Sequence, residues 1–244
     1  EITIGTAKVT PEEMNGVPHH FVGQLSIEDE YNGGKFEEDA IAKLEEIYSS
    51  QNVAILAGGS GLYVDAVCNG IDDIPKDNEV RKQLQAAYEE KGISYLQEEL
   101  KKLDPEHYNQ MNILNPQRLM RALEVCIVSG KTYTSFRTNS VKKRPFEIIK
   151  IGLTADREKI YNNINRRVHI MMEQGLLEEV KSVFNQRHLN ALNTVGYKEL
   201  FDHLEGKLAL DEAIAQIQQN TRRFAKRQLT WFKKDENTRW FDIS

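Results

Sequence analysis

Residues 36–67 constrain the fold of this chain more than any other part of its sequence. Apolar side chains recur at helical spacing over residues 36–49, and a continuous apolar run follows at 53–57. A glycine-rich turn occupies residues 58–61, and apolar residues resume over 62–67. This order of amphipathic helix, short apolar run, tight turn and helix is typical of an α/β fold, and it predicts a buried parallel strand at 53–57.

The rest of the chain divides into a helical middle and a mixed end. After a polar connector, helical spacing predicts helices at 79–90, 94–103 and 116–128. Beyond a basic linker, the sequence predicts strands at 148–153 and 240–243 and helices at 156–175, 176–184 and 211–234. We therefore predict an α/β core formed by residues 1–73 and 145–244, with a helical insertion at 74–144.

Composition excludes several classes of protein. Only two cysteines are present, Cys68 and Cys126, so the chain has neither a disulfide framework nor a cysteine-rich zinc site. No run of about 18 apolar residues occurs, which argues against a membrane span. Two thiols without a signal peptide predict a cytoplasmic location.

Charge is unevenly distributed along the chain. The overall net charge is −5, but residues 1–110 carry −13 and residues 111–244 carry +8. A basic half suggests that one part of the protein binds a polyanion, although ordinary solvated surfaces would give the same counts. The densest cationic segment, 221–234, holds six Lys and Arg residues and no acidic residue. Its helical spacing suits a nucleic-acid backbone or a solvated surface helix.

Three further motifs could carry chemistry. The turn at 58–61 offers backbone N–H groups to an anion, but a tight turn without a ligand explains it equally well. Arg167 flanks the apolar stripe of the 156–175 helix, where it could bind a phosphate bidentately or cover the helix flank. Gln117, Arg118 and Arg121 lie on a helix that begins at Pro116, and they could contact bases, phosphates or solvent.

Short motifs along the whole chain together resemble the tRNA dimethylallyltransferase (isopentenyl transferase) family. In order, they are Ile4-Gly-Thr-Ala-Lys8, Val17-Pro-His-His20, Gly58-Gly-Ser-Gly-Leu-Tyr63, Asn115-Pro-Gln-Arg-Leu-Met-Arg-Ala-Leu-Glu124, Arg167-Val-His-Ile-Met171, Thr194-Val-Gly-Tyr-Lys-Glu199 and Ala225-Lys-Arg-Gln-Leu-Thr-Trp231. Each motif is short, so the resemblance depends on seven of them standing in the order found in the family.

The resemblance implies a P-loop NTPase-like α/β core with a parallel sheet and an all-helical insertion domain. It implies transfer of a dimethylallyl group from dimethylallyl diphosphate to the exocyclic amine of adenine 37, which lies 3′ of the anticodon. The acceptors would be tRNAs that decode codons beginning with U, bound through the anticodon stem-loop. The resemblance also implies Mg²⁺ as cofactor, no membrane and a monomer. A non-catalytic tRNA-binding module and an adenine-nucleotide isopentenyltransferase are the rival functions.

The resemblance also implies roles for individual residues, motif by motif. Arg167 matches the catalytic arginine that contacts the diphosphate. Thr6, Gly58 and Gly59 match positions of the substrate channel, and Ser60 replaces a threonine near the flipped base. Contacts to tRNA are implied for Ser60, Arg81, Gln117, Arg118, Leu119, Met120, Arg121, Lys226 and Arg227. No metal ligand is expected in this chain.

Two motifs that the resemblance implies ahead of Gly5 do not occur in this sequence. One is the phosphate-binding Gly-Pro-Thr-Ala-Ser-Gly-Lys-[Ser/Thr] loop, which also supplies the hydroxyl that binds Mg²⁺. The other is an Asp-Ser-Arg-Gln-type segment, whose Asp is the general base. We expect a chain without these groups to be inactive, because losing a single oxyanion donor already costs on the order of a hundredfold in rate.

Overall fold

The structure of the chain is a computed structural model that describes residues 2–138 and 141–244. The helices within these ranges are α1 (Pro11–Met14), α2 (Gly33–Tyr48), α3 (Gly61–Asn69), α4 (Asn78–Leu103), α5 (Pro105–Gln110), α6 (Pro116–Ser129), α7 (Tyr133–Phe136), α8 (Arg157–Glu173), α9 (Leu176–Ser182), α10 (Tyr197–Leu204) and α11 (Leu210–Phe232). Short 3₁₀ turns follow α9 at Phe184–Gln186 and Asn190–Leu192. None of the described helices is long and apolar enough to span a membrane.

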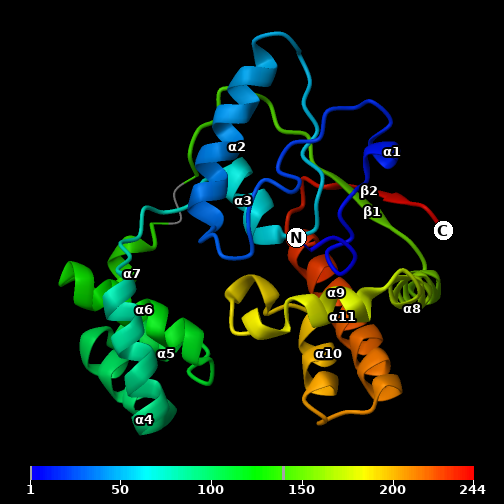
Figure 1. Cartoon of the computed structure of the whole chain (residues 1–244). Helices are drawn as coiled ribbons and strands as arrows, with labels where there is room; N and C mark the ends of the chain where they lie inside the picture. The colour runs from blue at the N-terminus through cyan, green and yellow to red at the C-terminus, as the bar shows by residue number, and fades with distance from the viewer. Residues whose placement is uncertain (1, 139–140) are drawn as a thin grey trace. The chain divides into compact units, whose positions relative to one another are not determined.

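The chain is organised in two compact units, whose elements are labelled in Figure 1. One unit, the sheet unit, comprises Glu1–Asn32, Ala57–Gly61 and Glu147–Ser244. The other, the bundle unit, comprises Gly33–Leu56 and Leu62–Phe146. The bundle unit is larger than the 74–144 insertion predicted from the sequence, because it also includes α2 and α3. The insertion as a domain of its own stays a prediction.

A buried carboxylate ties α2 and α3 to the segment that follows α7. Glu37 is 6% exposed and accepts hydrogen bonds from Ile71 N at 2.9 Å, Lys142 Nζ at 2.9 Å and Arg144 Nη2 at 2.8 Å. Arg144 also donates to two carbonyls at the end of α3. Burial raises the pKa of Glu37, but the hydrogen bonds from Lys142 and Arg144 outweigh it and hold this pKa below its usual range.

The described strands form a small parallel sheet. β1 (Ile151–Thr154) pairs with β2 (Arg239–Asp242), with Ile151 opposite Arg239 and Thr154 opposite Asp242. An ion pair between Lys150 and Asp235 joins the segments that lead into the two strands. The strands predicted at 148–153 and 240–243 are therefore confirmed, with bounds shifted by one to three residues.

The prediction of a buried strand at 53–57 is wrong. Residues 53–57 have no regular secondary structure, and Val53 and Ile55 are 76% and 89% exposed. A strand needs a neighbour that pairs with its backbone. Among the described residues, the only strands are β1 and β2, which pair with each other, so this apolar run leads into the glycine turn without joining a sheet.

Helices α4 to α7 form a bundle with its own hydrophobic core. Leu96 and Leu100 of α4 and Leu123 of α6 are 0% exposed within this core. Gly92 has a φ of 74° and interrupts α4, so the helices predicted at 79–90 and 94–103 are confirmed as two halves of one kinked element. The 116–128 prediction is confirmed as α6, which ends at Gly130 in the left-handed conformation.

A second core lies in the sheet unit between α8, α9, α10 and α11. Tyr197 and Leu200 of α10 are 0% exposed, and Val168 of α8 and Ile217 of α11 pack in the same cluster. The apolar stripes that predicted helices at 156–175, 176–184 and 211–234 face this cluster. The N-terminal residue Ile4 packs at its edge, which brings the start of the chain to the helices near its end.

Candidate functional site

The glycine turn predicted as an anion site lies against α11. Gln228 Nε2 donates a hydrogen bond to the carbonyl of Gly59 at 2.9 Å. A Cβ atom on Gly59 would lie 2.1 Å from Gln228 Nε2, and one on Gly61 would lie 2.4 Å from the Trp231 ring. Gly61 therefore needs to be glycine, because the bulky Trp231 ring of α11 lies against its backbone, whereas at position 59 only the flexible end of Gln228 would have to move. The fold thus joins the 58–61 turn to the basic stretch around Gln228, 169 residues away.

The predicted contact residues at this turn face solvent. Gly58, Ser60, Lys226 and Arg227 are exposed. Neither Lys226 nor Arg227 forms an ion pair with any residue that the structure describes, and the Arg227 guanidinium lies over the Phe224 ring. Exposed cations with free donors are suited to an RNA backbone.

Thr6 lies in a tight turn that a glutamate organises. Glu179 of α9 accepts hydrogen bonds from the backbone N–H groups of Thr3, Ile4 and Gly5, at 2.7, 2.9 and 2.9 Å. The hydroxyl of Tyr197 donates to the same carboxylate at 2.6 Å. A Cβ atom on Gly5 would lie 2.5 Å from the Tyr197 ring, which explains the glycine of the Gly-Thr-Ala-Lys motif. Thr6 itself is exposed.

These hydrogen bonds fix the charge state of Glu179. Burial raises the pKa of Glu179, but the N–H donors and the Tyr197 hydroxyl outweigh it and lower this pKa to about 2. Burial, together with the neighbouring carboxylate, raises the pKa of Tyr197 far above its usual value, so its hydroxyl remains a donor. The turn at residues 3–6 therefore folds around a permanent negative charge at neutral pH.

Arg167, the predicted catalytic residue, is exposed on α8. The next residue, Val168, is 2% exposed and lies in the core, so Arg167 stands beside the buried face of the helix, as the apolar spacing predicts. Its guanidinium forms no hydrogen bond or ion pair with any residue in 2–138 or 141–244. Arg166 is also exposed but points about 100° away around the helix. A free guanidinium on a packed helix can bind a diphosphate bidentately.

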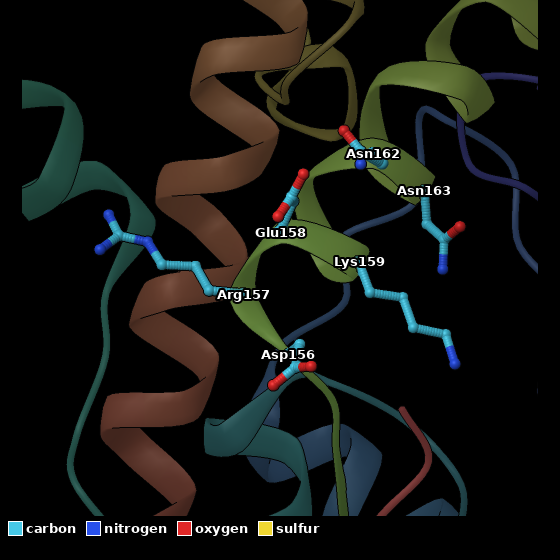
Figure 2. A pocket seen from close by; sticks show the side chains of 6 residues that line it. All are labelled: Asp156, Arg157, Glu158, Lys159, Asn162 and Asn163. Atoms are coloured by element: carbon cyan, nitrogen blue, oxygen red, sulfur yellow. The ribbon is translucent and has the colours of Figure 1, made fainter.

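Two open hollows adjoin each other along the first turns of α8. One has a volume of about 590 Å³ and is lined by Asp156, Arg157, Glu158, Lys159, Asn162 and Asn163, as Figure 2 shows. The other, of about 600 Å³, is lined by Arg157, Glu158, Tyr161, Asn162, Asn165 and Arg222. Neither hollow is lined by a site residue that the sequence analysis predicted.

In the helical bundle, three predicted RNA-binding residues form one cluster. Arg81 Nη2 donates to Gln117 Oε1 at 2.5 Å. Glu124, 4% exposed, lies 3.1 Å from Arg121 Nη1 and 3.8 Å from Arg81 Nη1. Arg121 also donates to two carbonyls of the connector at 74–75. The guanidinium of Arg121 therefore bonds within the protein, where it fixes the connector at 74–75 to α6.

The prediction that the side chains of Leu119 and Met120 contact tRNA is wrong. Both side chains are 0% exposed and belong to the core of the bundle, so they do not reach a surface that RNA could touch. The cause is helical geometry, because α6 turns positions 119 and 120 toward α4 and leaves Gln117 and Arg118 exposed.

The described residues hold no group of three His, Cys, Asp or Glu side chains that could bind a metal ion. No protein ligand for the Mg²⁺ that the resemblance implies is therefore assigned among them. Glu179 was missed by the sequence analysis, which also gave no definite role to Tyr197 and Gln228. The backbone N–H groups that Glu179 binds lie 174 residues or more away, and the carbonyl that Gln228 binds lies 169 residues away, and no local pattern signals such pairs.

Comparison with known proteins identifies relatives over the whole chain. A family model described as IPP transferase matches residues 1–235. The tRNA dimethylallyltransferase 1 of Phocaeicola vulgatus is 52% identical over 242 residues, which cover 99% of this chain and 81% of that protein. The tRNA dimethylallyltransferase of Flavobacterium johnsoniae is 51% identical over 251 residues, covering 100% of this chain and 81% of that protein.

Solved structures confirm the predicted α/β, P-loop-like fold class. The crystal structure of the full-length tRNA isopentenylpyrophosphate transferase from Bacillus halodurans matches with a TM-score of 0.68 and 37% identity, covering 98% of this chain and 76% of that one. A eukaryotic dimethylallyltransferase acting on tRNA matches with a TM-score of 0.77 and covers 98% of this chain and 63% of that one. Its identity is 22%, so it supports the fold alone.

Proposed function

The chain belongs to the IPP transferase family, and we propose that it transfers a dimethylallyl group from dimethylallyl diphosphate to the adenine 3′ of the anticodon. The acceptors are tRNAs that decode codons beginning with U. The observation that carries this proposal is 52% identity to a tRNA dimethylallyltransferase over 99% of the chain. Transfer of a dimethylallyl group to tRNA is the activity shared by the relatives, and the particular adenine and codon set are our proposal.

The reaction replaces a carbon–oxygen bond with a carbon–nitrogen bond. The exocyclic amine of the adenine attacks the allylic carbon, the diphosphate leaves with the bonding electron pair, and a base removes the proton from nitrogen. Negative charge grows on the departing oxygen, so a cation aimed at that oxygen lowers the barrier. We assign this role to Arg167, because its guanidinium has no partner among the described residues and is fixed on a packed helix.

The base and the phosphate-binding loop belong, by resemblance, to the segment expected ahead of Gly5. The turn at residues 3–6 would connect that segment to the fold, and Glu179 and Tyr197 hold this turn in place. Mg²⁺ would supply further charge at the diphosphate, and the described residues assign it no ligand.

The acceptor RNA is held by exposed polar residues in both units. In the sheet unit these are Ser60, Lys226 and Arg227, near the glycine turn. In the bundle unit they are Gln117 and Arg118, with Arg81 bonded to Gln117. The 74–144 insertion is thus the part of the bundle unit that we propose to grip the anticodon stem-loop. We further propose that the protein works as a cytoplasmic monomer.

A transfer assay with the full-length gene product tests the function. The protein is incubated with radiolabelled dimethylallyl diphosphate and either an anticodon stem-loop whose adenine lies 3′ of the anticodon, or the same RNA with guanine there. We expect label in the adenine RNA and none in the guanine RNA. Preferential labelling of free AMP would instead identify an adenine-nucleotide enzyme. RNA binding without any labelled product would identify a non-catalytic module.

A further inference from the structure

Two arginines from different helices converge on the ring of Tyr161, a residue of α8. The guanidinium of Arg157 lies 5.1 Å from the centre of the Tyr161 ring, and that of Arg222, from α11, lies 5.8 Å from it. Arg157 Nε donates to the Tyr161 hydroxyl at 3.1 Å. Arg222 Nη1 donates to Asn165 Oδ1 at 2.6 Å. A neutral phenol and a neutral amide therefore hold both guanidiniums in place.

These side chains open onto the 600 Å³ hollow described above. Arg157, Tyr161 and Arg222 all line it, and so does one carboxylate, Glu158. Glu158 forms an ion pair with neither arginine, so the lining carries a net positive charge. Figure 2 shows the Arg157 side chain extending away from Lys159 and Asn163, which leave α8 on another side. The cation of Arg157 is thus separated from that of Lys159, and the Arg157 side chain lines both hollows.

The two guanidiniums have donors left for a ligand. Each carries five N–H bonds and uses one of them in a described hydrogen bond. Within the described residues neither arginine has an ion-pair partner. Two like charges around one ring repel each other, and an anion bound by both would relieve that repulsion.

Another arginine of the same chain packs on an aromatic ring and also has a carboxylate partner. The Arg187 guanidinium lies 4.5 Å from the centre of the Phe184 ring, so it also packs on an aromatic side chain. Its Nε, however, donates to Glu205 at 2.8 Å, and this carboxylate neutralises it. The arginines of the Tyr161 cluster pack on an aromatic ring in the same way, but neither forms an ion pair with a carboxylate among the described residues.

We propose that Arg157, Tyr161 and Arg222 form a binding site for a phosphodiester group of the RNA substrate, an inference that rests on the proposed function. The guanidiniums would bind the phosphate oxygens, with the Tyr161 ring as a rigid support for both. A phosphate fits better than a base, because the guanidiniums already lie over the ring. We assign the phosphate to RNA and not to the prenyl donor, because an RNA backbone carries a series of phosphates. The following turns of α11 present a row of exposed cations that could bind them, Arg223, Lys226 and Arg227.

The double variant Arg157→Ala/Arg222→Ala tests this site in the full-length protein. The probe is a fluorescent anticodon stem-loop. Its affinity for the protein is measured by fluorescence anisotropy at salt concentrations from about 50 to about 300 mM KCl. We expect roughly tenfold weaker binding near 100 mM salt and a salt slope reduced by about one per lost contact. Tyr161→Phe, which keeps the ring, should weaken binding less. Arg187→Ala is the matched control and should leave the slope unchanged.

The outcomes separate this site from the function itself. Loss of RNA affinity with an unchanged KM for dimethylallyl diphosphate supports the phosphodiester assignment. A raised KM for the diphosphate with unchanged RNA binding would assign the pair to the prenyl donor and overturn the inference. Unchanged values of both, in a variant whose circular dichroism and melting match the parent, would also overturn it. Absence of product from the parent protein would refute the proposed function instead, while the anisotropy still decides the RNA site.

Discussion

Replacing Glu179 by glutamine should release the turn at residues 3–6 from α9. One carboxylate oxygen accepts the N–H groups of Thr3 and Ile4 and the Thr3 hydroxyl, and the other accepts Gly5 N and the Tyr197 hydroxyl. A glutamine presents one oxygen only, so its amide N–H group must face at least two of these donors. Donors left without an acceptor in a half-buried site destabilise the native state.

The pKa of Glu179 sets the size of the effect. Lowering it from 4.5 to about 2 corresponds to an upper limit of about 3 kcal/mol, at 1.36 kcal/mol for each pKa unit. Because the side chain is partly exposed, solvent screening reduces this contribution, and we expect about 2 kcal/mol at pH 7. The folded-state pKa is depressed, so the stabilisation is complete above about pH 4.5 and is lost as the pH falls toward 2.

Urea unfolding of the parent and of Glu179→Gln at several pH values measures this difference. The difference in unfolding free energy between the two proteins should stay at about 2 kcal/mol from pH 7 to about pH 5 and should shrink steadily at lower pH. Hydrogen exchange of the amides of residues 3–5 should accelerate in the variant. Glu178→Gln is the control, because Glu178 is exposed and, among the residues that the structure describes, forms an ion pair only with Lys181 of the same helix. A variant as stable as the parent at pH 7, or a difference that does not change with pH, would refute the reasoning.

Three other substitutions test the packing that the structure describes. Leu119→Ala should cost about 3 kcal/mol in urea unfolding, because it opens a cavity in the bundle core, and it should leave the salt slope of RNA binding unchanged. Gly5→Ala should cost about 1–3 kcal/mol, since its Cβ would collide with the buried Tyr197 ring, and a melting temperature equal to that of the parent would contradict this geometry. Glu37→Gln should cost about 3 kcal/mol by leaving Arg144 without its ion-pair partner, whereas Glu38→Gln, on the exposed side of α2, should be nearly neutral in the same assay.

The helices were predictable because their signals are local. Apolar spacing located α2, α6, α8 and α11 to within a few residues, and Pro116 marked the start of α6. The same method failed at 53–57, because a continuous apolar run predicts a strand only if the fold also supplies a neighbouring strand. Pairing partners are a property of the tertiary structure, which the run itself does not contain.

The site was predictable where it depends on residue type, and unpredictable where it depends on distant partners. The exposed cations of α11 and the position of Arg167 beside the buried face both follow from helical spacing. By contrast, nothing local to Arg121 indicates that its donors bond to the connector at 74–75. Likewise, Glu179 resembles any surface glutamate until the start of the chain folds onto it.

The most direct test of the central claim compares two adjacent arginines on α8. Arg167→Ala and Arg166→Ala are assayed in the full-length protein, under single-turnover conditions with saturating tRNA and dimethylallyl diphosphate. If Arg167 stabilises the departing diphosphate, its loss should slow the chemical step by on the order of a hundredfold or more, and Arg166→Ala should retain nearly the parent rate. A parent-like rate for Arg167→Ala, or equal losses for both variants, would contradict the account.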